Sequence, residues 1–139
     1  MGRCHRYGRP LTLMMFDIDF FKKINDVHGH LAGDYVLREL AQTVKRMVRK
    51  EQCFARYGGE EFALVVPEDG LEKARIFAEK IRRTIEEKHF SFENQDIPVT
   101  LSIGVADMTQ DMTDPFQFIK VADANLYKAK KAGRNRVVV

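Results

Sequence analysis

Apolar positions along the chain recur with two different periods, which together predict an alternation of strands and helices. A continuous apolar run at residues 11–16 is typical of a central strand that is covered on both faces. Apolar residues at steps of three and four predict helices at residues 35–47 and 71–85. A further helix is predicted to begin at Pro115 and to end near Gly133, because glycine commonly follows the last helical turn.

A β-hairpin is predicted around the dipeptide Gly58-Gly59, with strands at residues 54–57 and 62–66. The remaining predicted elements are a helix at residues 20–27 and strands at residues 99–105 and 137–139. Because the pattern contains both a hairpin and helical crossovers, we expect an α/β fold. In this α+β sandwich, helices flank a mixed central β-sheet.

Composition and charge narrow the class of protein. The 139 residues are enough for one domain with a core of its own. The net charge of +3 comes from scattered basic residues, so we expect no nucleic-acid partner, and no apolar run is long enough to span a membrane. Two cysteines, Cys4 and Cys53, are too few for a disulfide framework, so we expect free thiols in a reducing cytoplasm.

Two aspartates follow the buried strand, as Asp17-Ile18-Asp19. Strand alternation places Asp17 and Asp19 on the same face. Asp19 precedes a predicted helix and is interpreted as its N-cap. Asp17 is harder to explain structurally, since a carboxylate that ends an apolar strand is costly unless it is hydrated, paired or bound to a cation. Together with one glutamate of the hairpin, Asp17 suits Mg²⁺, which needs few protein carboxylates.

The two glutamates of the hairpin are predicted to have different partners. If the two glycines alone form the turn, Tyr57 lies opposite Glu60 and Arg56 lies opposite Glu61. Glu61 then forms a cross-strand ion pair with Arg56, while Glu60 has no such partner. Glu60 is therefore the candidate metal ligand.

Two further groups of residues suggest binding chemistry. The free amides near Phe20, Phe21 and Lys22 can form an anion site at a helix start, although on these residues alone a solvated Lys22-Lys23 pair is the preferred explanation. Further along are the polar residues Asn25, His30 and Asp34. Asp34 can complement a helix dipole, and as a group these side chains can pair with the edge of guanine, whose N–H donors suit a carboxylate.

Five sequence blocks in this order resemble the GGDEF domain family of diguanylate cyclases, in its GGEEF variant. The blocks are FDIDFFKKIND (16–26), HGHLAGD (28–34), RYGGEEF (56–62), LSIGVA (101–106) and ADANLYKAKKAGRN (122–135). The resemblance implies a single nucleotidyl-cyclase-like domain over residues 1–139, with a β-hairpin that carries the GGEEF turn. It also implies Mg²⁺-dependent condensation of two GTP into cyclic di-GMP with release of two pyrophosphates. Each subunit of a transient homodimer would hold one GTP.

The resemblance assigns roles to individual residues. Asp17, Glu60 and the Ile18 carbonyl would bind Mg²⁺, with Mn²⁺ as an alternative. Glu60, assisted by Glu61, would accept the proton of the attacking 3′-hydroxyl. The residues implied to bind GTP are Phe20, Phe21, Lys22, Asn25, His30, Asp34, Gly58, Gly59, Lys130 and Arg134.

The chain departs from the family pattern in two places. The family's N-terminal helix with its Asp-x-Leu-Thr motif is not found, so we expect a fragment of a longer signalling protein with an upstream sensory domain. We expect this domain to be cytoplasmic and without membrane contact of its own, either free or as part of a membrane-anchored sensor. The family's product-inhibition site reads Arg49-Lys50-Glu51-Gln52 here, so its aspartate is replaced and the site is interpreted as degenerate.

Two alternative functions remain at this point. One is a catalytically inactive module that binds GTP or cyclic di-GMP, which the intact signature residues argue against. The other is a cyclase that accepts ATP, which the retained Asp34 argues against.

Overall fold

The fold is organised around one central strand, β1 (Leu11–Ile18), which pairs antiparallel with strands on both sides. The structure, a computed structural model, describes residues 11–67, 70–108 and 114–139. The other strands of the main sheet are β2 (Cys53–Arg56), β3 (Glu61–Pro67), β6 (Leu101–Asp107) and β7 (Val137–Val138). The strand order is β2-β3-β1-β6-β7, and β7 is parallel to β6, so the predicted mixed sheet is confirmed.

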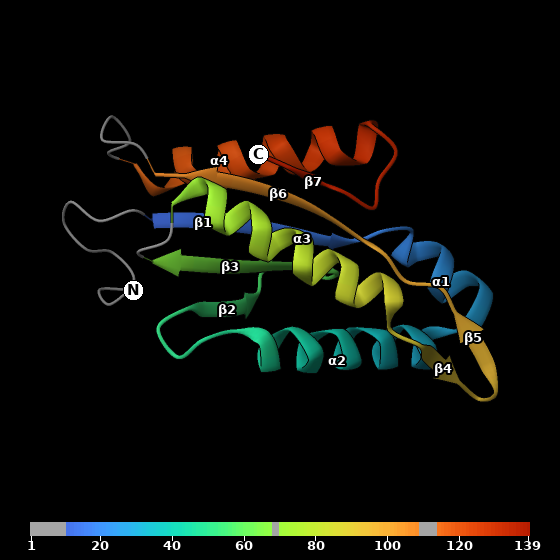
Figure 1. Cartoon of the computed structure of the whole chain (residues 1–139). Coiled ribbons are helices and arrows are strands. Elements are labelled where there is room, and N and C mark those ends of the chain that lie inside the picture. Colours follow the sequence, from blue (N-terminus) through green and yellow to red (C-terminus); the bar gives the residue numbers. More distant parts are fainter. Residues whose placement is uncertain (1–10, 68–69, 109–113) are drawn as a thin grey trace.

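Helices cover both faces of this sheet (Figure 1). They are α1 (Phe21–His28), α2 (His30–Met47), α3 (Leu71–Glu87) and α4 (Pro115–Lys131). Alternate β1 residues such as Met14 and Phe16 pack in the core shared with α2 and α3, while Leu13 and Met15 pack against α4. Every residue of β1 is buried, as predicted for a strand covered on both faces. Among the described residues, no helix is long and apolar enough to cross a membrane.

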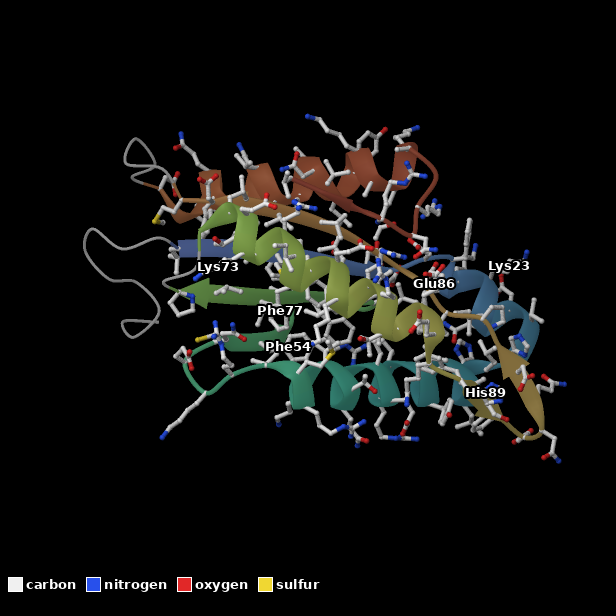
Figure 2. The ribbon with its side chains drawn as sticks, viewed as in Figure 1. Lys23, Phe54, Lys73, Phe77, Glu86 and His89 are labelled. Carbon is white, nitrogen blue, oxygen red and sulfur yellow. The ribbon has the colours of Figure 1, made fainter. Side chains whose placement is uncertain are left out.

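Aromatic rings fill the layer between the sheet and α2 and α3. Phe54 of β2 stacks on Phe62 of β3, with ring centroids 5.6 Å apart, and lies 6.2 Å from the ring of Phe16. Phe54 and Phe77 of α3, both labelled in Figure 2, pack against this core. These contacts fix β2, and with it the hairpin, on the side of the sheet that faces α2.

Gly104 of β6 lets α4 lie directly on the sheet. A Cβ atom at this position would come within 2.2 Å of two backbone atoms of α4, the Ala122 oxygen and the Leu126 nitrogen. The Asn125 side chain adds a hydrogen bond of 2.8 Å to the carbonyl oxygen of Val105. The backbone of α4 is therefore held at a fixed height over β6.

A second hairpin was not predicted. It consists of β4 (Phe90–Phe92) and β5 (Gln95–Ile97), and its two turn residues, Glu93 and Asn94, have φ values of 50° and 65°. Such turns usually contain glycine, which makes this one hard to recognise from sequence. The helix predicted at residues 35–47 begins earlier, at His30, because Gly29 separates it from α1.

The expectation of a free thiol was wrong for Cys53. This residue opens β2 and is disulfide-bonded. The other cysteine of the sequence, Cys4, lies outside the described residues.

Candidate active site

Asp17 lies near the end of β1 and is only 6% exposed. The Lys130 ammonium group of α4 donates a hydrogen bond to its Oδ2 atom. Its Oδ1 atom is buried and has no hydrogen-bond partner in the described part of the chain. Burial raises the pKa of the Asp17 carboxyl, and this effect exceeds the opposing effect of Lys130. An unsatisfied carboxylate oxygen in a buried position is costly, and a bound cation would satisfy it.

Glu61 is the direct neighbour of Asp17 across the β1–β3 ladder. Burial raises the pKa of the Glu61 carboxyl, and the charges of Asp17 and Asp123 raise it further. Like charges on opposite residues of a strand pair repel each other. Asp17 and Glu61 therefore form an acidic pair that a cation between them would stabilise.

The hairpin has a different register from the one predicted. Arg56 pairs with Phe62, and the Tyr57 N–H donates to the Glu61 carbonyl at 2.8 Å, so the turn contains three residues, 58–60, and the pairing is shifted by one position. The predicted ion pair between Arg56 and Glu61 is therefore wrong. The Arg56 guanidinium instead donates to the carbonyl oxygen of Gly59, at 3.0 and 2.6 Å, and so braces the loop.

This register leaves both glutamates next to the end of β1. The Ile18 N–H donates to the Glu60 carbonyl oxygen at 3.3 Å, and Glu61 lies opposite Asp17. The four residues implied as metal ligands or proton acceptors thus come together in space. The argument that singled out Glu60 by elimination no longer holds, because Glu61 is not occupied by Arg56.

Asp19 is not the N-cap of α1, as was predicted. The N-cap is Phe20, which has a left-handed backbone with φ of 56° and makes no side-chain capping bond. The Asp19 carboxylate is 3% exposed and points toward β6, where it accepts hydrogen bonds from Thr100 Oγ1 at 2.7 Å and Ser102 Oγ at 2.6 Å. It also accepts the backbone N–H of Asn135 at 2.9 Å.

The two elements implied to hold the triphosphate meet at the end of β1. The Arg134 guanidinium lies 4.5 Å from the centre of the Phe20 ring, directly before the first turn of α1. Lys130, four residues before Arg134 in the last turn of α4, reaches Asp17. The amides at the start of α1, which include Phe21 and Lys22, therefore lie on the same side of the sheet edge as both cations.

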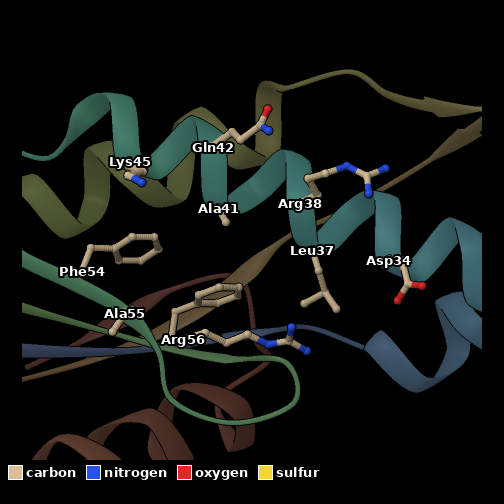
Figure 3. A pocket seen from close by; sticks show the side chains of 10 residues that line it. Asp34, Leu37, Arg38, Ala41, Gln42, Lys45, Phe54, Ala55 and Arg56 are labelled. Carbon is tan, nitrogen blue, oxygen red and sulfur yellow. The ribbon is translucent and has the colours of Figure 1, made fainter.

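A cavity of about 570 Å³ opens between α2 and the hairpin (Figure 3). Its apolar lining includes Leu37 and Phe62, and Asp34 lies at one end. The side chain of Asn25 is close to this region, because a Cβ atom on Gly33 would come within 1.8 Å of the Asn25 Oδ1 atom.

The other expected GTP contacts divide into two groups. His30 begins α2 and is exposed, and it does not line the cavity. Gly58 and Gly59 lie in the hairpin loop beside the acidic pair. The structure therefore brings the loop glycines, but not His30, to the residues that surround Asp17 and the cavity.

Arg49 and Gln52 form a local turn at the end of α2. The Gln52 side chain is 8% exposed, and its Oε1 atom accepts the backbone N–H of Arg49 at 2.9 Å. The Arg49 Nε atom lies 3.5 Å from a carboxylate oxygen of Glu51. The acceptor of Gln52 is thus occupied by its own turn.

Two residues near the acidic pair were missed in the sequence. Asp123 lies seven residues before Lys130, which places both on one side of α4 and was a usable signal. The backbone N–H of Asn135, in a turn 116 residues later, donates a hydrogen bond to Asp19, and no local sequence pattern predicts such a contact.

Comparisons with known proteins identify the family. The family signature described as "Diguanylate cyclase, GGDEF domain" matches residues 1–136. Diguanylate cyclase A of Treponema denticola is 43% identical over 129 residues, which are 93% of this chain and 35% of that protein. The chain therefore spans about a third of this curated relative.

Solved structures match the fold closely. The GGDEF domain of DgcB from Caulobacter crescentus, in complex with c-di-GMP, superposes with a TM-score of 0.90 and 35% identity, covering 94% of this chain and 78% of that one. Diguanylate cyclase SiaD of Pseudomonas aeruginosa, in complex with its activator SiaC, gives a TM-score of 0.91 and 36% identity, covering 99% of this chain and 52% of that one. The chain belongs to the GGDEF domain family of diguanylate cyclases.

Proposed function

We propose that this chain condenses two molecules of GTP into cyclic di-GMP and releases two pyrophosphates. The observation that carries the proposal is the pairing of a buried Asp17, whose Oδ1 atom has no hydrogen-bond partner among the described residues, with Glu61 opposite it. Two cations, Lys130 and Arg134, lie at the same end of β1. Membership of the family adds the reaction class, although the chain spans only part of its curated relatives.

The donor atoms at this site suit Mg²⁺, with Mn²⁺ as the alternative. In the described ranges, no three acidic, histidine or cysteine side chains converge on one point. Two carboxylates, Asp17 with Glu60 or Glu61, and the Ile18 carbonyl would hold the ion, which leaves coordination positions for phosphate oxygens. When bound, the ion would supply positive charge to the reacting phosphate.

The substrate would lie across the end of β1. Lys130, Arg134 and the amides at the start of α1 would bind the triphosphate, because all three are donors that lie near the end of β1. The guanine base enters the cavity beside Asp34, whose carboxylate accepts the N–H donors on its edge. Asn25, which packs on Gly33, contacts the same base from α1.

The chemical step joins two GTP molecules, each of which is bound by a separate protein chain. The 3′-hydroxyl oxygen of one GTP bonds to the α-phosphorus of the other, and the bond to pyrophosphate breaks. A hairpin glutamate, Glu60 or Glu61, accepts the hydroxyl proton. The raised pKa of the Glu61 carboxyl favours its role as that acceptor. Since one chain offers one such site, two chains face each other as a transient homodimer and form both bonds.

The experiment that tests this function is incubation of the chain with GTP and Mg²⁺, followed by chromatographic separation of the nucleotides. We expect cyclic di-GMP and pyrophosphate in a ratio of about one to two, as the atom balance of the condensation requires. The matched control is Asp17→Asn, which keeps the size of the side chain and removes its charge. If the wild type binds GTP but leaves it unchanged, the inactive binding module replaces this proposal.

The cellular setting follows from the same proposal. As a source of a diffusible nucleotide signal, the domain acts in the cytoplasm, where GTP is found, under an upstream sensory domain. SiaD, which has the same fold, is bound by its activator SiaC, so control of such a domain by another protein has a precedent.

A further inference from the structure

The turn that follows α4 has an unusual backbone. Gly133, Arg134 and Asn135 have φ values of 126°, 64° and 48° in succession. A left-handed backbone is readily adopted by glycine but is unfavourable for residues with a side chain, and here two such residues are adjacent. One hydrogen bond, from the Arg134 N–H to the Ala129 carbonyl at 2.9 Å, closes the helix end. Other contacts must hold Asn135 in place.

Both polar atoms of the Asn135 side chain form hydrogen bonds with α3. Its Nδ2 atom donates to Glu86 Oε2 at 2.7 Å, and its Oδ1 atom accepts from Arg82 Nη1 at 2.8 Å. Glu86 lies in the last turn of α3 (Figure 2). Because the amide nitrogen faces a carboxylate and the amide oxygen faces a guanidinium, only one orientation of the amide satisfies both partners. The backbone N–H of the same residue binds Asp19.

The partners of Asn135 are themselves held firmly. The Arg82 side chain is 12% exposed and forms two hydrogen bonds with Glu79, at 2.9 and 2.6 Å, and one with Glu86 at 3.0 Å. Asp19 is bound by two hydroxyl groups of the strand β6 region. We call these four residues, Asp19, Arg82, Glu86 and Asn135, the junction. The junction connects the end of β1 to α3 through the turn after α4.

The junction lies next to the residues assigned to the triphosphate. Phe20 follows Asp19 in the chain, and Arg134 precedes Asn135, so the contact between Phe20 and Arg134 is continuous with the junction. Lys130 lies in the last turn of α4, four residues before Arg134, and contacts Asp17. A shift of the turn would therefore move Arg134 relative to the acidic pair and to Lys130, whose own place is set by α4.

We propose that the junction is a positioning device for the triphosphate, in which Arg82 of α3 sets the place of Arg134 relative to Lys130 through Asn135 without touching the substrate. This inference rests on the proposed function, which assigns Arg134 and Lys130 to the phosphates. It goes beyond the proposed function, because it assigns a role in nucleotide affinity to Arg82, a residue of α3 that lies outside the binding site.

If the junction has a purely structural role, its loss should change nucleotide affinities differently than if it positions the triphosphate. Loss of a structural contact would unfold part of the chain and weaken all nucleotides together. Loss of a positioning contact would weaken only ligands that carry β- and γ-phosphates. The comparison therefore uses α,β-methylene-GTP, whose bridging carbon prevents loss of pyrophosphate, and GMP, which keeps the base, the ribose and one phosphate.

The experiment is calorimetric titration of both nucleotides, with Mg²⁺, into the wild type, Arg82→Gln and Asn135→Gly. Glycine at position 135 keeps the left-handed backbone accessible and removes only the amide contacts. We expect both variants to bind α,β-methylene-GTP about tenfold more weakly, the effect of one displaced charge-assisted hydrogen bond, and to bind GMP as the wild type does. The control is Arg75→Gln, because Arg75 also pairs with a glutamate three residues away on α3, Glu72, at 3.1 Å, and has no contact with the turn.

A double-variant comparison tests whether the effect passes through Arg134. Arg82→Gln should add little further loss of α,β-methylene-GTP affinity once Arg134 is replaced by alanine. Equal losses for both nucleotides, or full additivity with Arg134→Ala, would overturn the inference. If Asn135→Gly does not fold, Arg82→Gln decides the question by the same two criteria.

The outcomes also separate this inference from the proposed function. A wild type that binds α,β-methylene-GTP but makes no cyclic di-GMP overturns the proposed function, and the binding ratios still decide the role of the junction. A wild type that does not bind α,β-methylene-GTP overturns both.

Discussion

Asp17 and Glu61 lie directly opposite each other on the neighbouring strands β1 and β3. Burial raises the pKa of each carboxyl, and for Glu61 the charge of Asp17 is the next largest cause. Two carboxylates in this arrangement destabilise each other until a cation lies between them. This relationship gives the metal site a physical basis that is independent of the family signature.

The Asp17→Asn variant should lose nearly all turnover. The amide keeps the shape of the side chain but cannot supply the charge that a divalent cation needs, so we expect cyclic di-GMP formation to fall by about a hundredfold or more. Glu61→Gln should be similarly damaging, because Glu61 is not paired with Arg56. The measurement is initial rate with saturating GTP and Mg²⁺, alongside circular dichroism to verify folding. Near-wild-type turnover in Asp17→Asn would refute the metal assignment.

The metal-free chain should become more stable as the pH falls from 7.5 to 5. The folded pKa values of Asp17, Glu61 and Asp123 are raised, mainly by burial, so the folded state binds protons more readily than the unfolded state. Their contribution to the free energy of unfolding is complete below the unfolded values, 3.8 for aspartate and 4.5 for glutamate, and is lost as the pH rises through the raised values.

Thermal unfolding in a chelating buffer across this pH range measures the effect. Asp17→Asn should flatten the dependence, since it removes one of the three groups. The glutamates with lowered pKa values, such as Glu79, act in the opposite direction only near and below pH 4.5, outside the range measured. A melting temperature that falls steadily from pH 7.5 to 5 would contradict the prediction.

Asp34 should make the enzyme prefer GTP over ATP. Its carboxylate accepts the N–H donors of guanine, whereas adenine offers it a ring nitrogen with no proton at the corresponding position. Asp34 is exposed in the structure, and a mismatch that leaves its carboxylate unpaired once a bound base covers it gives a preference of roughly a hundredfold. Competition between the two nucleotides at equal concentration, with product analysis, provides the measurement. Comparable rates would show that Asp34 does not read the base.

Feedback inhibition by cyclic di-GMP should be weak in this chain. The only side-chain oxygen of Gln52 already accepts the backbone N–H of Arg49, and a neutral amide replaces the carboxylate of the family's inhibitory site. We expect the Gln52→Asp variant to bind cyclic di-GMP about tenfold more tightly, because its second oxygen is free to accept the N–H donors of the product.

Calorimetric titration of cyclic di-GMP into the wild type and Gln52→Asp tests this expectation, with Arg49→Ala as the control that removes the neighbouring cation. The expectation fails if the wild type binds as tightly as Gln52→Asp at a site that depends on Arg49.

Local sequence signals predicted the elements that the chain builds from adjacent residues. The run at residues 11–16 could be recognised as a central strand because burial on both faces requires continuous apolar side chains. Asp17 stood out because a charge at the end of such a strand needs a partner. Both inferences depend on a few neighbouring residues, and the structure agrees with them.

Contacts that depend on the length of a loop or on residues far away in the sequence could not be predicted. The assignment of Glu61 to Arg56 failed because a turn of three residues, rather than two, shifts the pairing by one position. Asp19 was interpreted as an N-cap because its hydrogen-bond partners lie 81, 83 and 116 residues away. In both cases the chemistry of the residue was recognised, and the fold determined what it contacts.

Gly104 makes the site sensitive to a position that touches no nucleotide. Alanine there would press against the α4 backbone, and relief of that overlap would displace the helix whose last turn carries Lys130. Overpacking of this kind typically costs about 1–3 kcal/mol. In a genetic screen that scores cyclic di-GMP output for every substitution, we expect position 104 to be as intolerant as Asp17. A map of tolerated substitutions would then place Gly104 among the functional residues, although its only effect is on the distance between α4 and β6.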